Sequence, residues 1–229
     1  MSRIGDAPKR REDQRFVTGA GAYLDDLQFA GLSHAVFVRS PHAHARITGI
    51  ATAAAQVMPG VLAVLTANDA AADGLKPLVP FVTANTVTDE PLAWDPQPLL
   101  AEHTVRFVGE PVALVIAETE AQALDAAEAV AASYETLRAV TDGRAALAGD
   151  AVEISTDIPG NLCMDWHHGD QAAIEAAEAA GARTISIGLM NHRIVTNPME
   201  PRGGVGVFDA GTGRYTLHVS SQNIHINRD

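Results

Sequence analysis

The residues whose types could support chemistry gather near the C-terminus of the chain. Ser220, Ser221, Gln222 and Asn223 follow residues 215–219, in which apolar side chains alternate with polar ones. Alternation at every second residue predicts a half-buried β-strand. Functional side chains are often presented where a strand ends, because the scaffold fixes that position. This segment is therefore a candidate site, although periodicity alone predicts a hairpin and not a function.

Glu200 is a second candidate, because a carboxylate can act as a general acid or base. It lies between Pro198 and Pro201 and close to Arg202. That setting favours a structural ion pair or hydrogen bonds to backbone amides. We therefore expect a structural role for Glu200 and assign it no catalytic one.

Two pairs of histidines suggest metal ligands by their spacing. His42 and His44 are near neighbours in the sequence, and His167 and His168 are adjacent. No third ligand of a suitable type lies close to His42 and His44, and protein zinc sites use at least three protein ligands. We therefore expect surface or hydrogen-bonding histidines at all four positions and assign no metal ligand.

Composition excludes several classes of protein. The 229 residues include 28 acidic and 16 basic side chains, and the net charge of −12 argues against binding to a nucleic-acid backbone. No apolar run is long enough to predict a transmembrane helix. Cys163 is the single cysteine, so neither an intrachain disulfide nor a cysteine-ligated cluster is expected. Motifs of serine hydrolases, P-loop proteins, zinc proteases and Cys-x-x-Cys oxidoreductases are absent. These features predict a globular cytoplasmic protein that binds neither nucleic acid nor membrane.

The elements that would position the candidate residues alternate between strands and helices. Apolar runs predict strands at residues 32–38, 45–50, 61–65, 105–108, 112–117 and 184–189, and a hairpin that joins 205–208 to 215–219. Helices are expected at residues 51–58, from Thr119 with apolar spacing that continues to Tyr134, and at 171–180. Thr119 and Gln122 form a capping box, while Asp170 and Gly181 suit the two ends of the last helix. Residues 73–98 are expected to form a long irregular loop and residues 141–165 a connection.

Four stretches of the chain carry motifs in a specific order. They are residues 11–26, Val-Arg-Ser-Pro-His-Ala-His-Ala-Arg-Ile at 38–47, Arg-Phe-Val-Gly-Glu-Pro-Val-Ala at 106–113, and Asn-Pro-Met-Glu-Pro-Arg-Gly at 197–203 with Ser-Ser-Gln-Asn at 220–223. Together they resemble the molybdopterin-binding large subunit of the xanthine dehydrogenase family, which includes aldehyde oxidases and carbon monoxide dehydrogenase. The resemblance extends from about Ile4 to Asp229. One departure is that Tyr134-Glu135 is followed by Thr-Leu-Arg-Ala, where the family typically has Leu-Pro.

The resemblance implies an α/β (α+β) fold: an α/β hammerhead domain followed by the first elements of a molybdopterin-binding domain. The implied divisions are an N-terminal arm at 1–17, the hammerhead domain at 18–140, and a connection with the incomplete cofactor domain at 141–229. It also implies that Gln222 hydrogen-bonds an oxygen ligand of molybdenum, as the glutamine of this motif does in the family. A side-chain amide suits that contact because it donates a hydrogen bond without adding charge. No catalytic residue is carried over, because the general base of the family has no match in this chain.

Family members oxidise a small molecule of the aldehyde, N-heterocycle or carbon monoxide type, with water as the source of oxygen. The resemblance therefore implies a molybdenum–molybdopterin cofactor that is shared with the remainder of the subunit, expected as a separate chain. FAD and 2Fe–2S centres are expected on partner subunits, and we expect no activity without the rest of the large subunit. The alternative is a non-catalytic standalone assembly or binding module. Co-purification of a second chain would separate these two hypotheses.

Overall fold

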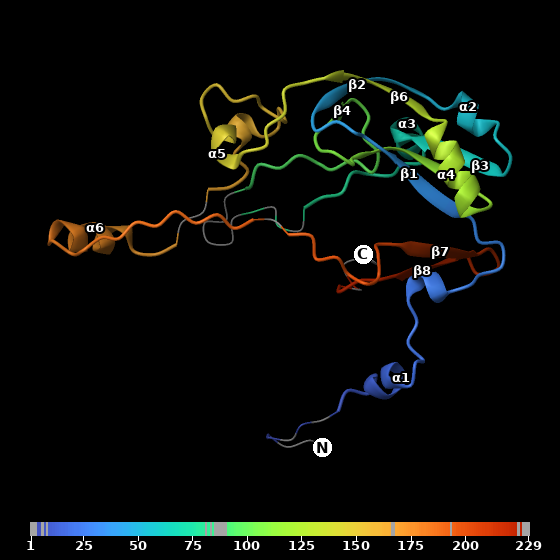
Figure 1. The fold of residues 1–229 in the computed structure, drawn as a ribbon, viewed down its shortest axis with the longest axis horizontal. Coiled ribbons are helices and arrows are strands. Elements are labelled where there is room, and N and C mark those ends of the chain that lie inside the picture. The colour runs from blue at the N-terminus through green and yellow to red at the C-terminus, as the bar shows by residue number, and fades with distance from the viewer. Residues whose placement is uncertain are drawn as a thin grey trace. The chain divides into compact units, whose positions relative to one another are not determined.

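The computed structural model describes residues 4, 5, 7, 9–80, 82, 84, 91–165, 168–192, 194–223 and 225. The chain forms two compact units, one of residues 32–184 and one that joins residues up to 31 with residues from 185 onward. Strands and helices alternate in the larger unit, which confirms the predicted mixed α/β class (Figure 1). No helix in these described parts is long and apolar enough to cross a membrane.

The larger unit contains two small antiparallel sheets. One has the order β1-β5-β3 and consists of β1 (His34–Arg39), β5 (Pro111–Ala117) and β3 (Val61–Thr66), with α4 (Glu120–Glu128) packed on one face (Figure 1). The other has the order β4-β2-β6 and consists of β4 (Thr104–Val105), β2 (Ala45–Ala51) and β6 (Ala131–Thr136). These strands confirm the predictions at residues 32–38, 45–50, 61–65 and 112–117.

The core of the larger unit is built from small aliphatic side chains. One buried cluster contains Ala55, Val64, Ala113, Val115, Ala126 and Val130, and a second contains Ala45, Ala101, Val105 and Val112. The central strand β5 contributes to both clusters, because successive side chains of a strand point to opposite faces of its sheet. Val115 therefore packs in the cluster that includes α4 residues, and Val112 packs in the cluster of the second sheet.

The start of α4 confirms the predicted cap, but its predicted length is wrong. The Thr119 hydroxyl accepts a hydrogen bond from the Gln122 backbone N–H at 3.3 Å and donates one to Gln122 Oε1 at 2.9 Å. The helix ends at Glu128, and the residues expected to continue it form β6. Ala132 and Tyr134 pack against the second core cluster at a period of two, and the strand pairs with β2. Sheet pairing and packing therefore override the helical spacing here.

Two further elements are shorter than predicted. The strand expected at residues 105–108 is only β4, because the Arg106 backbone N–H donates to the Glu110 side chain and the chain turns there. The helix expected at 51–58 is α2 (Ala53–Gln56), and Gly60 follows with a φ of +77°. The positive φ favours glycine at this position, and a Cβ there would displace the amide group of the Gln122 side chain.

Segments expected to be irregular contain short elements. α3 (Ala67–Ala72), which the sequence did not predict, precedes the loop at 73–98, whose described part holds only isolated bridges such as Leu78 with Gln97. The connection at 141–165 contains α5 (Gly143–Ala146) and the 3₁₀ turn η2 (Pro159–Asn161). The irregular loop is thus confirmed in its described part, and the connection is more ordered than predicted.

The next two segments give opposite outcomes for the sequence predictions. α6 (Gln171–Ala179) confirms its predicted helix: Asp170 accepts from the Ala173 backbone N–H at 2.9 Å, and Gly181 has a φ of +88°. The strand predicted at 184–189 is wrong. Ile185, Ile187 and Leu189 alternate as a strand would, but they are 78%, 77% and 80% exposed. Alternation can produce a strand only where a pairing partner exists, and the described residues provide none.

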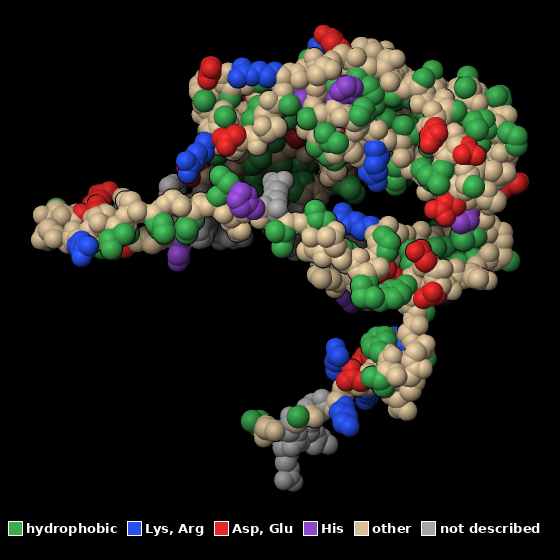
Figure 2. Space-filling view, in the orientation of Figure 1, with side chains coloured by type: hydrophobic (Ala, Val, Ile, Leu, Met, Phe, Trp, Pro, Cys, Tyr) green, Lys and Arg blue, Asp and Glu red, His purple; other side chains and the backbone are tan. Residues whose placement is uncertain are grey.

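The smaller unit is dominated by a β-hairpin. β7 (Gly204–Asp209) pairs with β8 (Arg214–Val219), which confirms the prediction, and α1 (Asp13–Val17) and the 3₁₀ turn η1 (Leu24–Asp26) precede it in sequence. Its apolar side chains are largely uncovered: Phe208, Tyr215 and Leu217 are 54%, 79% and 59% exposed. Figure 2 shows hydrophobic side chains on the surface over these strands. A two-stranded sheet of this kind is marginally stable without a covering layer.

Limited proteolysis of the isolated chain should therefore remove the C-terminal segment first. Segments with few buried apolar contacts open at low free-energy cost, so proteases reach them before they reach a packed core. Arg202 and Arg214 should be cut by trypsin before Arg39 and Arg46, although all four side chains are exposed. Mass spectrometry of a timed digest measures the order. Equal protection of both pairs in a monomeric sample would contradict the prediction.

Candidate functional site

Gln222 lies three residues beyond the end of β8, in the segment that the sequence predicted to follow the strand. Its side chain is exposed, and it sits in a bend of the chain. The bend is fixed by the next residue, because the Asn223 backbone N–H donates to Ser221 Oγ at 3.2 Å. The segment therefore offers a side-chain amide at a defined place, with no part in the packing of the hairpin.

The hairpin that carries Gln222 is positioned by a tight turn. Asp209 accepts hydrogen bonds from the Gly211 backbone N–H at 2.9 Å and from the Thr212 hydroxyl at 2.7 Å. These bonds, that from Thr212 foremost, lower the pKa of Asp209 below its ordinary value. Gly213 has a φ of +68°, a conformation that favours glycine. The rings of Phe208 and Tyr215 lie 4.6 Å apart and hold the strands in register beside the turn.

Glu200 binds the N-terminal segment of the chain. Its Oε1 accepts a hydrogen bond from the Leu24 backbone N–H at 2.8 Å, at the start of η1. Leu24 also lies close to the motif at residues 197–203, since a Cβ added at Gly203 would be 2.7 Å from Leu24 Cδ2. Phe29 and His218 make a further contact between these segments, with ring centroids 5.0 Å apart. The structural interpretation of Glu200, as an acceptor for a backbone amide, is confirmed.

The histidines of the second motif are also structural. His44 is 6% exposed, and its Nδ1 lies 2.8 Å from the Arg138 carbonyl oxygen. The ring of His42 packs edge-on against Tyr134 at 4.9 Å, and its backbone N–H donates to Ser40 Oγ at 3.0 Å. The described residues hold no group of three side chains that could ligate a metal ion. The hydrogen-bonding interpretation is confirmed for the ring of His44, whereas the ring of His42 contacts Tyr134 and His167 lies outside the described residues.

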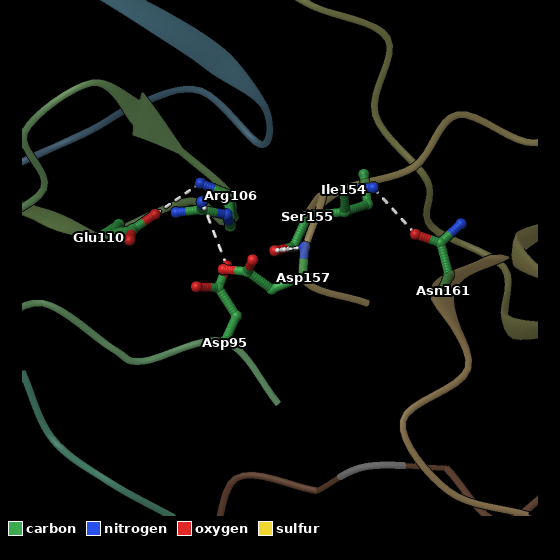
Figure 3. Close-up of polar contacts among 7 residues, drawn as sticks. All are labelled: Asp95, Arg106, Glu110, Ile154, Ser155, Asp157 and Asn161. Atoms are coloured by element: carbon green, nitrogen blue, oxygen red, sulfur yellow. Dashed lines mark hydrogen bonds and ion pairs between the residues drawn. The ribbon is translucent and has the colours of Figure 1, made fainter. Parts of the chain in front are cut away.

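A buried polar cluster that sequence reasoning missed lies in the larger unit (Figure 3). Glu110 is 3% exposed, and its Oε2 accepts from the Arg106 backbone N–H at 2.5 Å. Arg106 Nη2 lies 3.2 Å from Asp95 Oδ2. The pair is poorly aligned, because Asp95 Oδ2 and Arg106 Nε are buried without a hydrogen-bond partner among the described residues. The sequence motif from Arg106 to Glu110 could have indicated the contact between these two residues. It could not indicate the contact with Asp95, because Asp95 lies in the irregular loop.

A second polar network orders the connection between residues 146 and 161 (Figure 3). Asn161 Oδ1 accepts from the Ile154 backbone N–H at 2.9 Å, and Asn161 Nδ2 donates to the carbonyl oxygens of Ala146 and Val152 at 3.0 Å each. Asn161 itself has a φ of +57°, which asparagine tolerates better than most residues. One side chain thus replaces the backbone pairing that this segment lacks, which explains why it is ordered without long elements.

Replacing Glu110 with glutamine tests the burial of this carboxyl group. Burial raises the pKa of Glu110 above 4.5, and the hydrogen bond from Arg106 opposes that shift without cancelling it. A raised folded-state pKa gives stability that is present below the ordinary value and is lost as pH rises through the folded value. Glutamine keeps the acceptor and stays neutral, so the melting temperature of Glu110→Gln should gain on the unmodified protein between pH 4 and pH 7. A difference that stays constant or falls with pH would show that burial does not disfavour the charged form.

Two known protein-family models match most of the chain. A family model described as the aldehyde oxidase and xanthine dehydrogenase a/b hammerhead domain matches residues 18–138, more than half of the chain. A second, described as the molybdopterin cofactor-binding domain, matches residues 154–229. The two matches lie in the order that the sequence motifs implied.

Individual relatives agree with the family matches. The carbon monoxide dehydrogenase large chain of Hydrogenophaga pseudoflava is 37% identical over 95% of this chain, and the nicotine 6-hydroxylase large subunit of Paenarthrobacter nicotinovorans is 38% identical over 97%. This chain covers 27% and 26% of those proteins, so it spans about a quarter of their length.

Solved structures show the same fold. Quinoline 2-oxidoreductase from Pseudomonas putida 86 superposes with a TM-score of 0.76 at 36% identity, over 95% of this chain and 27% of that one. A Cu,Mo-CO dehydrogenase superposes with a TM-score of 0.79 at 34% identity, over 96% of this chain and 28% of that one. The chain therefore belongs to the aldehyde oxidase and xanthine dehydrogenase family and combines its hammerhead domain with a part of its molybdopterin cofactor-binding domain.

Proposed function

We propose that this chain is the N-terminal part of the large subunit of a molybdenum-cofactor hydroxylase or dehydrogenase. The observation that carries the proposal is the ordered pair of family matches, at residues 18–138 and 154–229. Relatives named as large chains or subunits cover nearly all of this chain, yet it covers about a quarter of each. Within the proposal, residues 1–17 form an arm, 18–140 the hammerhead domain, and 141–229 a connection and part of the cofactor domain.

Gln222 is the residue of this chain that we propose contacts the cofactor. Its exposed amide at the end of β8 can donate a hydrogen bond outward without disturbing the hairpin. The donor is neutral, so it suits the oxygen-rich, anionic molybdenum end of such a cofactor. When bound, the cofactor would supply oxidation of a carbon centre with water as the oxygen source. Gln222 would orient it, while the remainder of the subunit would hold the pterin and supply the general base.

The relatives support a proposal about the chemical class of the substrate. The names of the relatives include carbon monoxide, nicotine, quinoline, aldehyde and xanthine enzymes. We propose a small molecule of the aldehyde, N-heterocycle or carbon monoxide type. Oxidation releases electrons, so partner subunits with 2Fe–2S and FAD centres would carry them onward. A cytoplasmic complex of this kind also fits the single cysteine, which cannot hold a cluster itself.

Purification of the tagged chain from its native host tests the proposal. Under the proposal, it co-elutes with the remainder of the large subunit and with polypeptides that show flavin and iron–sulfur absorption. The complex should reduce an artificial electron acceptor when it is given an aldehyde, an N-heterocycle or carbon monoxide. A chain that elutes alone, without these chromophores, would instead support the alternative of a non-catalytic standalone module.

A further inference from the structure

The open end of the hairpin β7–β8 is the end that carries Gln222. Its last strand pairs are Gly204 with Val219 and Val205 with His218. Gln222 follows Val219 by three residues, so the two Cα atoms lie within about 11 Å of each other. The position of Gln222 therefore depends on how firmly this end of the hairpin is held.

The hairpin has little of its own to hold this open end. β7 contains Gly204 and Gly206, and Gly203 precedes it. Glycine loses more backbone entropy on folding than other residues and has no side chain to pack, so it weakens a strand. The turn end is different, because the side chain of Asp209 closes it with two hydrogen bonds. In a two-stranded sheet, which is marginally stable by itself, the open end should fray first.

Residues 23–29, from the other end of the chain, contact the hairpin at its open end (Figure 1). On the β7 side, Leu24 Cδ2 lies only 2.7 Å from the position that a Cβ on Gly203 would take. On the β8 side, the ring of Phe29 lies 5.0 Å from that of His218. His218 is half-buried, whereas the other residues of β8 are exposed. The segment therefore touches both strands where the hairpin is weakest.

Glu200 fixes this segment to the hairpin by a charge-assisted hydrogen bond. Its half-buried carboxylate accepts from the Leu24 backbone N–H at 2.8 Å. The Tyr23 backbone N–H donates to Asp26 Oδ2 at 2.8 Å, which closes the turn η1 and leaves the next amide, that of Leu24, directed at Glu200. Hydrogen bonds to a carboxylate are about twice as strong as those between neutral groups. The bond thus joins the chain just before β7 to a pre-formed turn.

We propose that Glu200 is a positioning residue for Gln222. By holding residues 23–29 against the open end of the hairpin, it fixes the place from which the Gln222 amide is presented. Glu200 acts through Leu24 and the strand ends, and it needs no contact with the cofactor itself. The inference rests on the proposed function, in which Gln222 donates a hydrogen bond to the cofactor. It assigns a role in that site to the Glu200 carboxylate and to a segment far from Gln222 in the sequence.

Amide hydrogen exchange in the complex that contains this chain tests whether Glu200 holds the open end. Glu200→Ala removes the acceptor, so peptides that cover residues 203–207 and 216–220 should exchange about 2–10-fold faster, the factor expected from the loss of one hydrogen bond. Glu200→Gln keeps an acceptor oxygen and should stay close to the unmodified rate. Exchange in the turn at 209–214 should not change. Glu12→Ala, at an exposed glutamate of the same unit, is the matched control and should exchange like the unmodified protein.

Turnover per bound molybdenum separates positioning of Gln222 from a general loss of stability. Glu200→Ala should lower turnover about 2–10-fold when Gln222 is present, and Glu200→Gln should restore most of it. In a Gln222→Ala background, the same Glu200→Ala change should have little further effect, because the side chain that it positions is absent. Such non-additivity is the expected signature of two residues that act through one contact.

Two results would overturn the assignment of Glu200. Equal losses of turnover with and without Gln222 would show that Glu200 supports the fold and not the position of Gln222. Unchanged exchange at the open end in Glu200→Ala would show that residues 23–29 do not hold it. Molybdenum on the unmodified complex is measured in parallel. If molybdenum is present and Gln222→Ala lowers turnover, either result contradicts the role of Glu200 alone, whereas absence of molybdenum contradicts the proposed function.

Discussion

Replacing Gln222 with alanine in the assembled enzyme should lower turnover per bound molybdenum by about 10–100-fold. This range is typical for the loss of a residue that hydrogen-bonds a ligand of a metal ion. Gln222 lies beyond β8 and its side chain is exposed, so truncation removes no packing from the hairpin. The free energy of unfolding should change by no more than about 0.5 kcal/mol, as for other surface substitutions. A large loss of turnover with little loss of stability is the signature of contact with the cofactor.

Gln222→Glu should be worse than the alanine variant. It preserves the size of the side chain but replaces the amide donor with a carboxylate, which repels an anionic centre. Thr216→Ala, an exposed position on β8, is the matched control and should leave turnover unchanged. The measurement is steady-state turnover normalised to bound molybdenum, with a thermal melt of each variant. Unchanged turnover in both Gln222 variants would assign this residue a structural role only.

Elements set by local signals were predictable from the sequence. The caps at Thr119 and Asp170 bind amides within their own helices, and the turn from Asp209 to Gly213 closes on itself. Each needs only a few neighbouring residues to form, so residue type and spacing are sufficient. For Glu200 the flanking prolines predicted a structural role, but not its partner, the backbone N–H of Leu24, which is distant in the sequence.

Three features that depend on residues distant in the sequence were not predicted correctly. The alternation at residues 184–189 describes what a strand would bury, but the described residues contain no strand to pair with it. The spacing from Leu124 to Tyr134 fits a helix, yet pairing with β2 makes its last part a strand. The contact of Arg106 with Asp95 joins a turn to an irregular loop, and no local pattern predicts that approach.

The candidate site itself came from two kinds of information. Alternation predicted that Gln222 follows a strand, and the hairpin β7–β8 has that arrangement. Its role came only from resemblance to the family, because an exposed glutamine at a strand end has no chemistry of its own. The family membership is established by the matches at residues 18–138 and 154–229, whereas the contact of Gln222 with the cofactor remains a proposal.

The isolated chain should not retain the molybdenum cofactor. Gln222 would contribute one amide hydrogen bond, which is worth about 0.5–1.5 kcal/mol net. Retention at micromolar concentration requires about 8 kcal/mol of binding free energy, so this contact alone falls far short. The hairpin that carries Gln222 also leaves its apolar side chains uncovered, including Tyr215 at 79% exposure. Both the missing affinity and the missing cover should come from the remainder of the subunit.

Molybdenum content per polypeptide, measured by inductively coupled plasma mass spectrometry, tests the central claim most directly. The comparison is between the purified 229-residue chain and the complex that contains it. We expect stoichiometric molybdenum in the complex and none on the isolated chain. Stoichiometric molybdenum on the isolated chain, or none on a complete complex from cells that make the cofactor, would contradict the assignment of this chain as one part of a molybdenum-cofactor subunit.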